Sequence, residues 1–433
     1  MRYWSEKIET MDRRQLSRLQ LKRLRTALHQ AARSDFYGNL LREKSIRPED
    51  IKSLEDLPQL PFTSKKNIRR SYPGGMLAVD LKKVVRIHAS SGTTGQSTVV
   101  YHTARDLAEW SELIVRCLVM AGCSRADVFQ NMMNYGLFTG GLGLHYGAEQ
   151  LGMMVIPSGG GNTVRQIQLM KDFGTTVIHI TPSYALHVSD VIRDTGQEVK
   201  SFKLRRLIFG AEPYSETTRD KLEKSYGVEA FNCYGLSEMN GPGVAFECRK
   251  SPGMHVWEDN YIVEVVDPAT GENLPAGEVG ELVFTTINRE AMPLIRYRTR
   301  DLAYLYPDTD CPCGRKFRRL SRILGRADDM LIVRGVNIFP SQVEHVLMGI
   351  PEVGTNYQIV LDRVENLDRM TVRVEIYGKM FHGDMNELRV LRKRIEHALK
   401  EEILLTTEVE LLEPGTIPPS TGKAKRVIDN RKL

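Results

Sequence analysis

Hydrophobic residues recur at helical spacing in the first part of the chain, from Lys7 to about Asn39. They stand among arginine and lysine side chains, a pattern that predicts an amphipathic helix. Further along, the apolar run Val84–His88 predicts a strand that opens into a loop of Gly, Ser and Thr over residues 90–98. The leucines that define the helical stripe are Leu16, Leu19, Leu21, Leu24 and Leu28.

Helical and strand-like segments then alternate over more than a hundred residues. This alternation predicts an α/β core with a largely parallel sheet. The expected helices are 107–122, 141–151, 164–173, 184–193 and 216–226, and the expected strands are 128–132, 153–156, 177–180 and 207–209.

The pattern changes beyond Cys233, where shorter strands at 261–266 and 280–286 favour antiparallel pairing. After Gly325 the chain restarts with a β-α-β-β-α-β order, which predicts a second, smaller domain. The expected fold class is therefore α/β, with a large multi-sheet N-terminal domain at 1–327 and a small mobile α+β C-terminal domain at 328–433. The strands expected there are 330–333, 358–361, 370–376 and 408–412, and the helices are 341–348 and 385–399.

The length and composition agree with two globular domains. The 433 residues exceed what one hydrophobic core supports, and 41% hydrophobic with 26% charged residues is typical of globular proteins. The net charge of +6 is spread without a basic block, so neither a nucleic acid nor a membrane surface is an expected partner. No run of about 18 apolar residues predicts a transmembrane span, and no export signal is found, so we expect a cytoplasmic protein with reduced cysteines.

The loop after the first predicted strand combines glycines with a row of hydroxyls. Glycines let a backbone approach a polyanion and hydroxyls donate to phosphate oxygens, so a nucleotide phosphate suits this loop. It is not a P-loop, because Gln96 stands where that motif requires lysine. Taken alone, a solvated turn explains the loop better. Its residues are Ser90, Ser91, Gly92, Thr93, Thr94 and Gly95.

Four further motifs follow in order: Tyr234–Glu238, Arg296–Asp301, Gly325–Met330 and Pro419–Lys423. With the loop, they give a sequence that resembles the adenylate-forming acyl-CoA ligase superfamily. Within it the chain is most similar to phenylacetate-CoA ligases, from about residue 5 to residue 432. The segments that carry the narrower resemblance are 135–143, 238–248, 254–259 and 334–342.

This resemblance implies a two-step reaction on one active site. A carboxylic acid attacks ATP to give an acyl-adenylate and pyrophosphate, and the thiol of CoA then displaces AMP. The implied ligands are the acid, preferably an aryl or arylacetic one, with ATP, Mg²⁺ and CoA. The small domain is expected to swing between the two steps, and a homodimer is the expected assembly.

The resemblance also implies a role for each motif residue. Lys423 would bridge the substrate carboxylate and the α-phosphate, Glu238 would ligate Mg²⁺, and Asp301 would accept from both ribose hydroxyls. Asp328 would be the hinge. The remaining implied residues are the phosphate loop at 90–95, Tyr234 with Gly210, Ala211 and Glu212 on the adenine side, Gly235 and Ser237 beside the nucleotide, Arg326 as a ribose or phosphate contact, and a strand at Arg334–Val336 that would bring Arg334 and Gly335 to the CoA tunnel.

Tyr135 and Phe138 lie in the segment from which these ligases build an aryl pocket, and aromatic side chains suit a phenyl ring. The alternative interpretation of this segment is core packing, since methionine often fills gaps and Met132 and Met133 stand beside it. The chain also departs from the family pattern at Met133, Gln96 and Tyr214, where an aromatic, a basic residue and a tryptophan are expected.

Cys248, His255, Cys311 and Cys313 offer a set of four ligands that fits tetrahedral zinc. A closed set of four leaves no position for water and would be structural. The alternative, unpaired loop thiols in a reducing compartment, is equally compatible with the spacing.

Two other functions compete with a CoA ligase. An adenylating ligase could pass its acyl group to a carrier protein or an amine, although no carrier domain is attached. A nucleotide-binding protein without turnover is the other alternative, but such a protein has no use for Lys423 together with Glu238 and Asp301.

Overall fold

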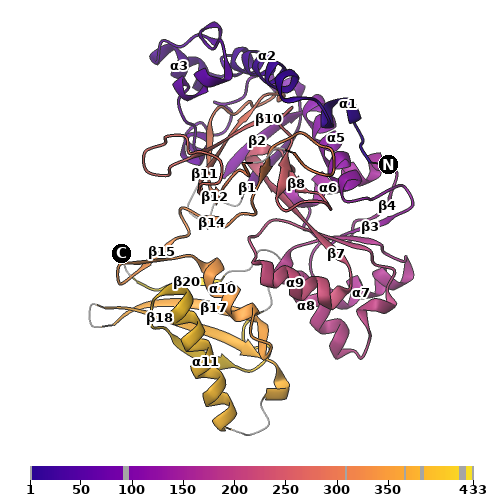
Figure 1. Cartoon of the computed structure of the whole chain (residues 1–433). Helices are drawn as coiled ribbons and strands as arrows, with labels where there is room; N and C mark the ends of the chain where they lie inside the picture. The colour runs from indigo at the N-terminus through magenta and orange to yellow at the C-terminus, as the bar shows by residue number, and fades with distance from the viewer. Residues whose placement is uncertain are drawn as a thin grey trace.

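The computed structural model describes residues 2–90, 97–307, 310–364, 367–380, 385–418 and 426–431. The chain folds into a larger N-terminal body and a smaller C-terminal body, drawn in indigo to orange and in orange to yellow in Figure 1. We use these two names for the elements up to β14 and for those from β15 onward.

An eight-stranded sheet forms the centre of the N-terminal body, in the order β13-β9-β8-β7-β6-β5-β3-β4. The strands β4, β3, β5, β6 and β7 run parallel, which confirms the α/β alternation that the sequence predicted. From β7 onward the pairing turns antiparallel. The bounds are β3 Val128–Asn131, β4 Met154–Ile156, β5 Val177–Ile180, β6 Arg206–Phe209, β7 Glu229–Leu236, β8 Gly241–Glu247, β9 Met254–Val256 and β13 Arg319–Leu320.

Helices cover this sheet, and side-chain caps fix where they begin. Thr103, Thr181 and Ser215 each accept a backbone hydrogen bond in the first turn of the helix that follows. Gly152 and Gly227 end two of them in the left-handed conformation that glycine adopts without strain. The helices are α5 Ala104–Met120, α6 Thr139–Leu151, α7 Thr163–Asp172, α8 Pro182–Asp194 and α9 Glu216–Tyr226.

Two smaller antiparallel sheets complete the N-terminal body, and the second contains the strands predicted at 261–266 and 280–286. One pairs β1 with β2, and the other has the order β10-β11-β12-β14. In the second sheet Asp301 lies directly opposite Arg326, a register that matters for the candidate site. The strands are β1 Val84–Ser90, β2 Thr98–Thr103, β10 Tyr261–Val266, β11 Gly280–Thr286, β12 Tyr297–Ala303 and β14 Gly325–Arg326.

The helix predicted from Lys7 to about Asn39 is interrupted, and this prediction was wrong in its continuity. Asp12 accepts from Gln15 N and Ser34 accepts from Tyr37 N, so each side chain caps a new helix. The leucines of the predicted stripe do lie on one helix, α2, but the two caps divide the predicted helix into three. The resulting helices are α1 Glu6–Glu9, α2 Arg13–Ala31 and α3 Asp35–Glu43, followed by α4 Lys65–Arg70.

The C-terminal body has a four-stranded sheet in the order β19-β18-β17-β20, with helices α10 and α11. The predicted β-α-β-β-α-β order is present, but two short strands, β16 and β20, were missed. Arg334 and Gly335 both have positive φ and form the turn of the β15–β16 hairpin, so of the strand expected at Arg334–Val336 only Val336 lies in a strand. The bounds are β15 Leu331–Val333, β16 Val336–Ile338, α10 Pro340–Met348, β17 Val353–Val364, β18 Leu367–Ile376, α11 Met385–Ile403, β19 Glu408–Leu412 and β20 Val427–Asp429.

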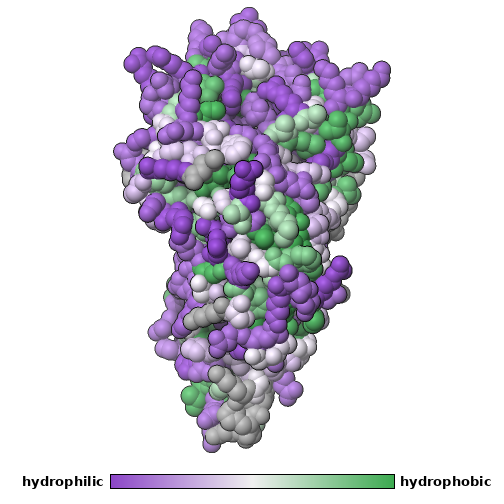
Figure 2. Space-filling model, turned by 90° about the vertical axis from the view of Figure 1, so that its right-hand side faces the viewer, coloured by the Kyte–Doolittle hydropathy of each residue, from purple (hydrophilic) through white to green (hydrophobic). Residues whose placement is uncertain are grey.

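One hydrophobic cluster extends across both bodies, from Tyr226 at the end of α9 to Val343 and Leu347 on α10. The C-terminal body therefore packs against α8 and α9, as Figure 1 shows. On the face shown in Figure 2, hydrophilic side chains predominate over both bodies, with smaller apolar patches between them. Within the described part of the chain, no helix combines the length and apolarity needed to cross a membrane.

Candidate active site at the junction of the two bodies

Asp301 is held by two predicted site residues from different strands. Tyr234, near the end of β7, donates from Oη to Asp301 Oδ2 at 2.7 Å, and Arg326 on β14 donates to Oδ1 at 3.0 Å. Burial and the neighbouring charge of Asp301 raise the pKa of Tyr234, so its hydroxyl stays protonated and donates. The structure thus brings Tyr234, Asp301 and Arg326 together, as their common assignment to a nucleotide site requires.

Glu238 lies just beyond β7, on a short 3₁₀ turn, and is buried. Tyr297 donates to its Oε1 at 3.1 Å, and the Lys65 ammonium is 3.8 Å from the same oxygen. A carboxylate in this setting fits the oxygen ligands that Mg²⁺ prefers. We call Glu238 and Asp301, with their partners Tyr234, Tyr297 and Arg326, the carboxylate cluster.

The backbone around Glu238 depends on close packing. A Cβ atom on Gly235 would lie 2.0 Å from the carbonyl oxygen of Gly241, so only glycine allows β7 and β8 to approach here. Ser237 is buried and its hydroxyl lies 3.2 Å from that of Thr139 at the start of α6. Both predicted residues therefore shape the end of β7, and their contact with a nucleotide stays a prediction.

The segment Gly210–Glu212 follows β6, next to β7 in the sheet, and Ala211 has a positive φ of 73°. Glu212 is turned toward α8, where its Oε1 accepts from Ser183 N at 2.6 Å. Burial raises the pKa of Glu212, although the hydrogen bond from Ser183 opposes this. Behind the segment, a Cβ atom on Gly210 would lie 3.9 Å from His179 Nε2.

The predicted hinge residue, Asp328, is bonded to the carboxylate cluster through Arg326. Arg326 Nε donates to Asp328 Oδ1 at 2.9 Å, while Nη1 of the same guanidinium reaches Asp301. Burial alone would lower the pKa of Arg326, but the carboxylates of Asp301 and Asp328 raise it above its ordinary value. One arginine therefore joins the expected ribose site to the expected hinge.

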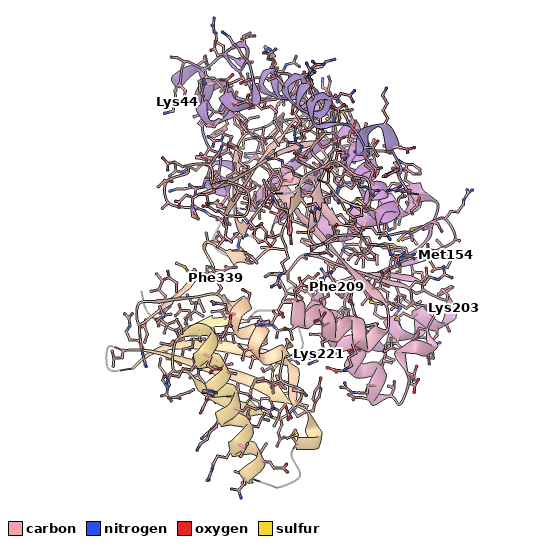
Figure 3. All side chains as sticks on the ribbon, viewed as in Figure 1. Lys44, Met154, Lys203, Phe209, Lys221 and Phe339 are labelled. Atoms are coloured by element: carbon pink, nitrogen blue, oxygen red, sulfur yellow. The ribbon has the colours of Figure 1, made fainter. Side chains whose placement is uncertain are left out.

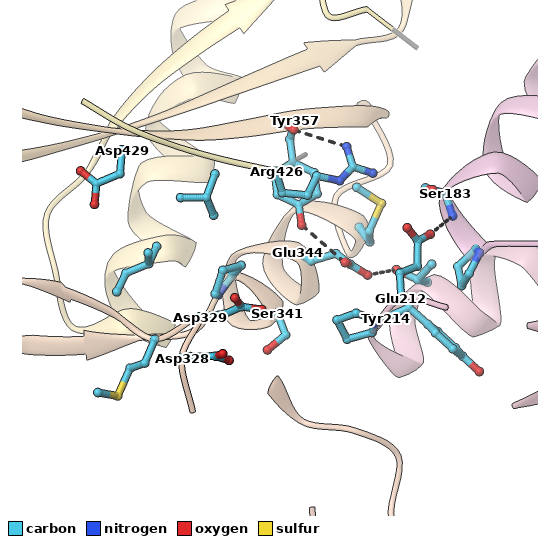
Figure 4. A pocket seen from close by; sticks show the side chains of 18 of the residues that line it. Ser183, Glu212, Tyr214, Asp328, Asp329, Ser341, Glu344, Tyr357, Arg426 and Asp429 are labelled. Carbon is cyan, nitrogen blue, oxygen red and sulfur yellow. Dashed lines mark hydrogen bonds between the residues drawn. The ribbon is translucent and has the colours of Figure 1, made fainter. Parts of the chain in front are cut away.

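A cavity of about 1060 Å³ opens beside this hinge, between α8 and α9 on one side and the C-terminal body on the other (Figure 4). Its lining includes the predicted residues Glu212 and Asp328, whereas Tyr234, Glu238 and Asp301 lie outside it. The other polar side chains labelled on its wall are Ser183, Tyr214, Asp329, Ser341, Glu344, Tyr357, Arg426 and Asp429.

Several predicted residues cannot be placed. Ser91, Gly92, Thr93, Thr94, Gly95 and Lys423 lie outside the described residues, and Ser90 is described only as the last residue of β1. The described residues next to these segments are in strands or beside one. Ser90 pairs with Thr98 on β2, and Arg426 immediately precedes β20.

Tyr135 belongs to a chain of hydrogen bonds between β3, β5 and α6. Asn131 Nδ2 donates to Tyr135 Oη at 2.9 Å, His145 Nδ1 lies 3.1 Å from the same hydroxyl, and His179 Nδ1 lies 3.0 Å from Asn131 Oδ1. Burial raises the pKa of Tyr135 to about 12. These partners fix the hydroxyl, so a substrate would meet the ring of Tyr135 rather than its oxygen.

The structure supports core packing for some residues of the predicted aryl-pocket segment and contradicts it for another. Met132 and Met133 are buried in the core, as the packing interpretation expected. Phe138 is 40% exposed, which contradicts core packing for this residue. Its ring lies close to the backbone of the next turn, since a Cβ atom on Gly140 would lie 2.3 Å from it.

The chain matches sequence models of both parts of the AMP-binding enzymes. The model of the AMP-binding enzyme matches residues 29–288, and that of the AMP-binding enzyme C-terminal domain matches residues 335–431. The phenylacetate-coenzyme A ligase of Thermus thermophilus is 46% identical, over 99% of this chain and all of the relative. That of Escherichia coli is 42% identical, over 98% of this chain and 97% of the relative.

The chain belongs to the phenylacetate-coenzyme A ligase family. It is an enzyme of the acid–thiol ligase class with the adenylate-forming fold, so the predicted family and fold class are confirmed.

A solved 2-hydroxyisobutyryl-CoA ligase in its postadenylation state, bound to an acyl-AMP, is 29% identical to the present chain. The superposition covers the whole of the present chain and 93% of the solved ligase, with a TM-score of 0.94. The same enzyme in its thioesterification state with CoA gives a TM-score of 0.74. The two bodies of this chain are therefore arranged as in the postadenylation state, and AMP and CoA are the ligands of this fold.

The sequence analysis missed three side chains that contact the family's motif residues. Tyr297 stands within the quoted Arg296–Asp301 motif, and the alternation along β12 places Tyr297, Thr299 and Asp301 on one buried side. That alternation was a usable signal. Lys65 and Asn131 come from segments without a motif, so only the fold reveals their contacts with Glu238 and Tyr135.

Cys248, His255, Cys311 and Cys313, which we call the cysteine cluster, converge at the far end of the large sheet, where β13 pairs with β9. All four side chains are buried, and their ligand atoms lie within 4.8 Å of one another. Cys313 Sγ lies 3.4 Å from His255 Nε2, and Cys248 Sγ lies 3.5 Å from Cys311 Sγ. His255 Nδ1 faces the carbonyl oxygen of Phe317 at 3.1 Å, which orients Nε2 toward the sulfurs.

Proposed function

We propose that this ligase activates an arylacetic acid such as phenylacetate with ATP and then transfers the acyl group to CoA, releasing AMP. The observation that carries the proposal is the carboxylate cluster, in which Asp301 is oriented by Tyr234 and Arg326 beside the buried Glu238. The names of the relatives supply the acid and the acceptor, and the two-step course is that of the family.

In the first step the residues of the cluster would bind and orient ATP. Asp301 would accept from the ribose hydroxyls, and Glu238 would hold Mg²⁺, which neutralises phosphate charge when bound. The loop at 90–95 would surround the β- and γ-phosphates. Lys423 would donate to the carboxylate and α-phosphate oxygens where negative charge develops, so that the acid oxygen bonds to phosphorus and pyrophosphate leaves.

In the second step the thiol of CoA would attack the acyl carbon and AMP would leave. We propose that the C-terminal body, with its boundary at residues 327 and 328, turns about Asp328 between the steps. The support is that Asp328 joins the two bodies and contacts Arg326. The β15–β16 turn at Arg334 and Gly335 would then lie beside the pantetheine arm of CoA.

The hinge is tested with Asp328→Pro. Proline fixes φ near −65°, so the variant should retain acid-dependent pyrophosphate exchange and lose acyl-CoA formation. Wild-type rates of acyl-CoA formation in this variant would contradict the assignment.

Tyr135 is proposed to face the aryl group of the acid, with Phe138 at the rim. The fixed hydroxyl of Tyr135 supports this, because it leaves the ring as the accessible surface and aromatic rings pair well edge to face. An acid with an apolar ring would therefore be preferred.

The function is tested by magnesium- and ATP-dependent pyrophosphate release with a panel of acids, with and without CoA. The panel holds phenylacetate, hydroxyphenylacetates, indoleacetate, benzoate and medium-chain fatty acids, and mass spectrometry identifies the products. A CoA thioester of an arylacetate is the expected result. Acyl-adenylate without thioester would favour a carrier-protein or amine acceptor, and no turnover would favour a nucleotide-binding protein.

We also propose that the cysteine cluster holds a structural zinc ion. Three sulfurs and one imidazole nitrogen within 4.8 Å fit a tetrahedral, closed site, and His255 already has the hydrogen-bonded orientation of a zinc ligand. Protein purified without chelator should contain about one equivalent of zinc. Less than half an equivalent would favour the alternative of unpaired thiols. The homodimer and the cytoplasmic location stay predictions, and sedimentation velocity tests the former.

A further inference from the structure

One carboxylate of the C-terminal body accepts two hydrogen bonds from the N-terminal body. Glu344 on α10 accepts with Oε1 from Ser215 N at 3.1 Å and from Thr218 Oγ1 at 2.7 Å. Ser215 is the residue that caps α9, and Thr218 lies in the first turn of that helix. The first N–H groups of a helix have no partner inside it and carry partial positive charge, so this position favours a carboxylate.

The second oxygen of Glu344 points into its own body. Tyr357 on β17 donates from Oη to Glu344 Oε2 at 3.4 Å, and the guanidinium of Arg426 lies over the Tyr357 ring, 4.4 Å from its centroid. Arg426 follows Lys423 by three residues in the sequence. Glu344 therefore connects α9 to the part of the C-terminal body where the segment carrying Lys423 ends.

A second carboxylate crosses this interface, since Asp190 on α8 accepts from Thr355 Oγ1 on β17 at 3.3 Å, which is longer than either bond of Glu344 to α9 and its cap. Thr217 and His345 form an exposed hydrogen bond at 2.9 Å. Lys221 Nζ, which points across the gap in Figure 3, lies 3.4 Å from the carbonyl oxygen of Val353. Of the interface hydrogen bonds described, the pair accepted by Glu344 joins a charged group to two buried donors, Ser215 and Thr218. Hydrogen bonds to charged groups are the stronger ones.

These contacts belong to one arrangement of the bodies. The TM-score is 0.94 against the postadenylation state of a related ligase and 0.74 against the thioesterification state of the same ligase. The relative position of the bodies therefore differs between these two states. We infer that adenylation takes place in the arrangement of the postadenylation state, and that Glu344 is a positioning residue that latches the C-terminal body there and releases it before thioesterification. The inference rests on the proposed two-step function.

A latch of this kind has a selective effect. Without it, the adenylation arrangement would be less populated, and the rate of adenylation would fall with its population. Loss of hydrogen bonds to a charged group predicts a decrease of about tenfold. Thioesterification starts from the released arrangement, so its rate should be unchanged or slightly higher.

The experiment compares Glu344→Ala and Glu344→Gln with the wild type in each half-reaction. Acid-dependent ATP–pyrophosphate exchange reports adenylation, and CoA thioester formation from supplied phenylacetyl-adenylate reports the second step. Glu344→Gln should lie between the wild type and Glu344→Ala, because an amide oxygen accepts both bonds without the charge. Glu216→Gln is the matched control: it removes an exposed carboxylate from the same helix turn, and its partners Arg219 and Arg322 lie in the N-terminal body.

A second measurement needs no activity. Hydrogen exchange in the full chain should accelerate at the amides of 215–218 in Glu344→Ala and stay unchanged in Glu216→Gln. Equal loss of both half-reactions, or unchanged exchange at these amides, would overturn the latch. If the wild type catalyses neither half-reaction with any acid of the panel, the proposed function fails, and the exchange data alone decide whether Glu344 holds the bodies together.

Discussion

The carboxylate cluster and the cysteine cluster are both built from buried polar side chains, but their partners differ. In the carboxylate cluster, Glu238 and Asp301 are contacted by hydroxyl and cationic groups from several strands. In the cysteine cluster the four ligand atoms face one another. The first arrangement orients acceptors that a ligand can share, whereas the second is closed.

The positions of the clusters agree with this difference. Arg326 links the carboxylate cluster to the hinge, where the chain passes from one body to the other. The cysteine cluster lies within the N-terminal body and joins the hairpin after β8 to the loop before β13. Substitutions in the carboxylate cluster should thus change the reaction rate, whereas substitutions in the closed cysteine cluster should change the stability of the fold. The following variants test that division.

Lys423→Ala should have the largest effect on rate. It removes the predicted donor to the charge that develops in adenylation, so that half-reaction should fall about 10²-fold or more. Thioester formation from supplied acyl-adenylate should be largely retained. Single-turnover assays of each half-reaction measure this, and an equal loss in both would remove the proposed role.

Asp301→Asn should lower kcat/KM for ATP by about 10- to 100-fold, because charge-assisted hydrogen bonds contribute about 1.5–3 kcal/mol. The thermal midpoint should change little, since the amide oxygen of asparagine can still accept from Arg326 while its NH2 group donates to the hydroxyl oxygen of Tyr234. Asp267→Asn, in an exposed turn where the carboxylate accepts from Ala269 N and Thr270 N, is the control. An equal effect of both substitutions on ATP use would place Asp301 outside the nucleotide site.

Cys313→Ala should act on stability. Loss of one ligand from a closed site should release the zinc and lower the free energy of unfolding by about 3 kcal/mol or more. The folded fraction should retain the kcat of the wild type. Cys123→Ala, a buried cysteine outside the cluster, should keep its zinc. Metal content and urea denaturation are the measurements, and a zinc-free wild type with equal stability in both variants would contradict the closed site.

His179, which belongs to the hydrogen-bonded chain around Tyr135 and to neither cluster, adds a dependence of stability on pH. Burial lowers its pKa from 6.5 to about 3, so the unfolded chain binds a proton that the folded chain does not. Stability should therefore fall as the pH drops below about 6.5, by about 2 kcal/mol between pH 7.5 and 5. His179→Gln should reduce the pH dependence of urea unfolding by this amount, whatever its effect at pH 7.5. An unchanged slope would mean that His179 binds its proton equally well in the folded and unfolded chain, against the burial effect.

Tyr3→Phe should have the smallest effect. Its hydroxyl donates to the carbonyl oxygen of Cys313 at 2.9 Å, and one such bond contributes about 1 kcal/mol to stability. The variant should keep its zinc and its turnover. A loss of zinc would show that the N-terminal segment is part of the metal site rather than a support for it.

The sequence predicted the fold where local patterns decide it. The alternation from 107 to 226 identified helices α5 to α9 and the parallel strands β3, β4, β5 and β6, because apolar periodicity reports burial directly. The fifth parallel strand, β7, lies beyond it. It failed where a single side chain interrupts a pattern, as Asp12 and Ser34 do in the N-terminal helices. It also failed at the hairpin turn of Arg334 and Gly335, where positive φ angles of 51° and 79° determine the conformation.

The candidate site could be predicted only as far as its residues stand in motifs. Tyr234, Asp301 and Arg326 were assigned together and meet in the structure, and the cysteine cluster converges across more than sixty positions from Cys248 to Cys313. The contacts of Lys65 and Glu344 come from pairings distant in the sequence. No local pattern encodes them, because they depend on how whole elements pack.

The N-terminal segment gives the cysteine cluster a place in the order of folding. Arg2 and Tyr3 donate to the carbonyl oxygen of Cys313, and Glu9 is buried against Arg315, more than 300 residues later. At a synthesis rate of about 5–20 residues per second, these partners emerge some tens of seconds after the segment itself. The segment from Arg2 to Glu9 is thus made long before its native partners, and the buried carboxylate of Glu9 stays without its arginine until Arg315 has been made.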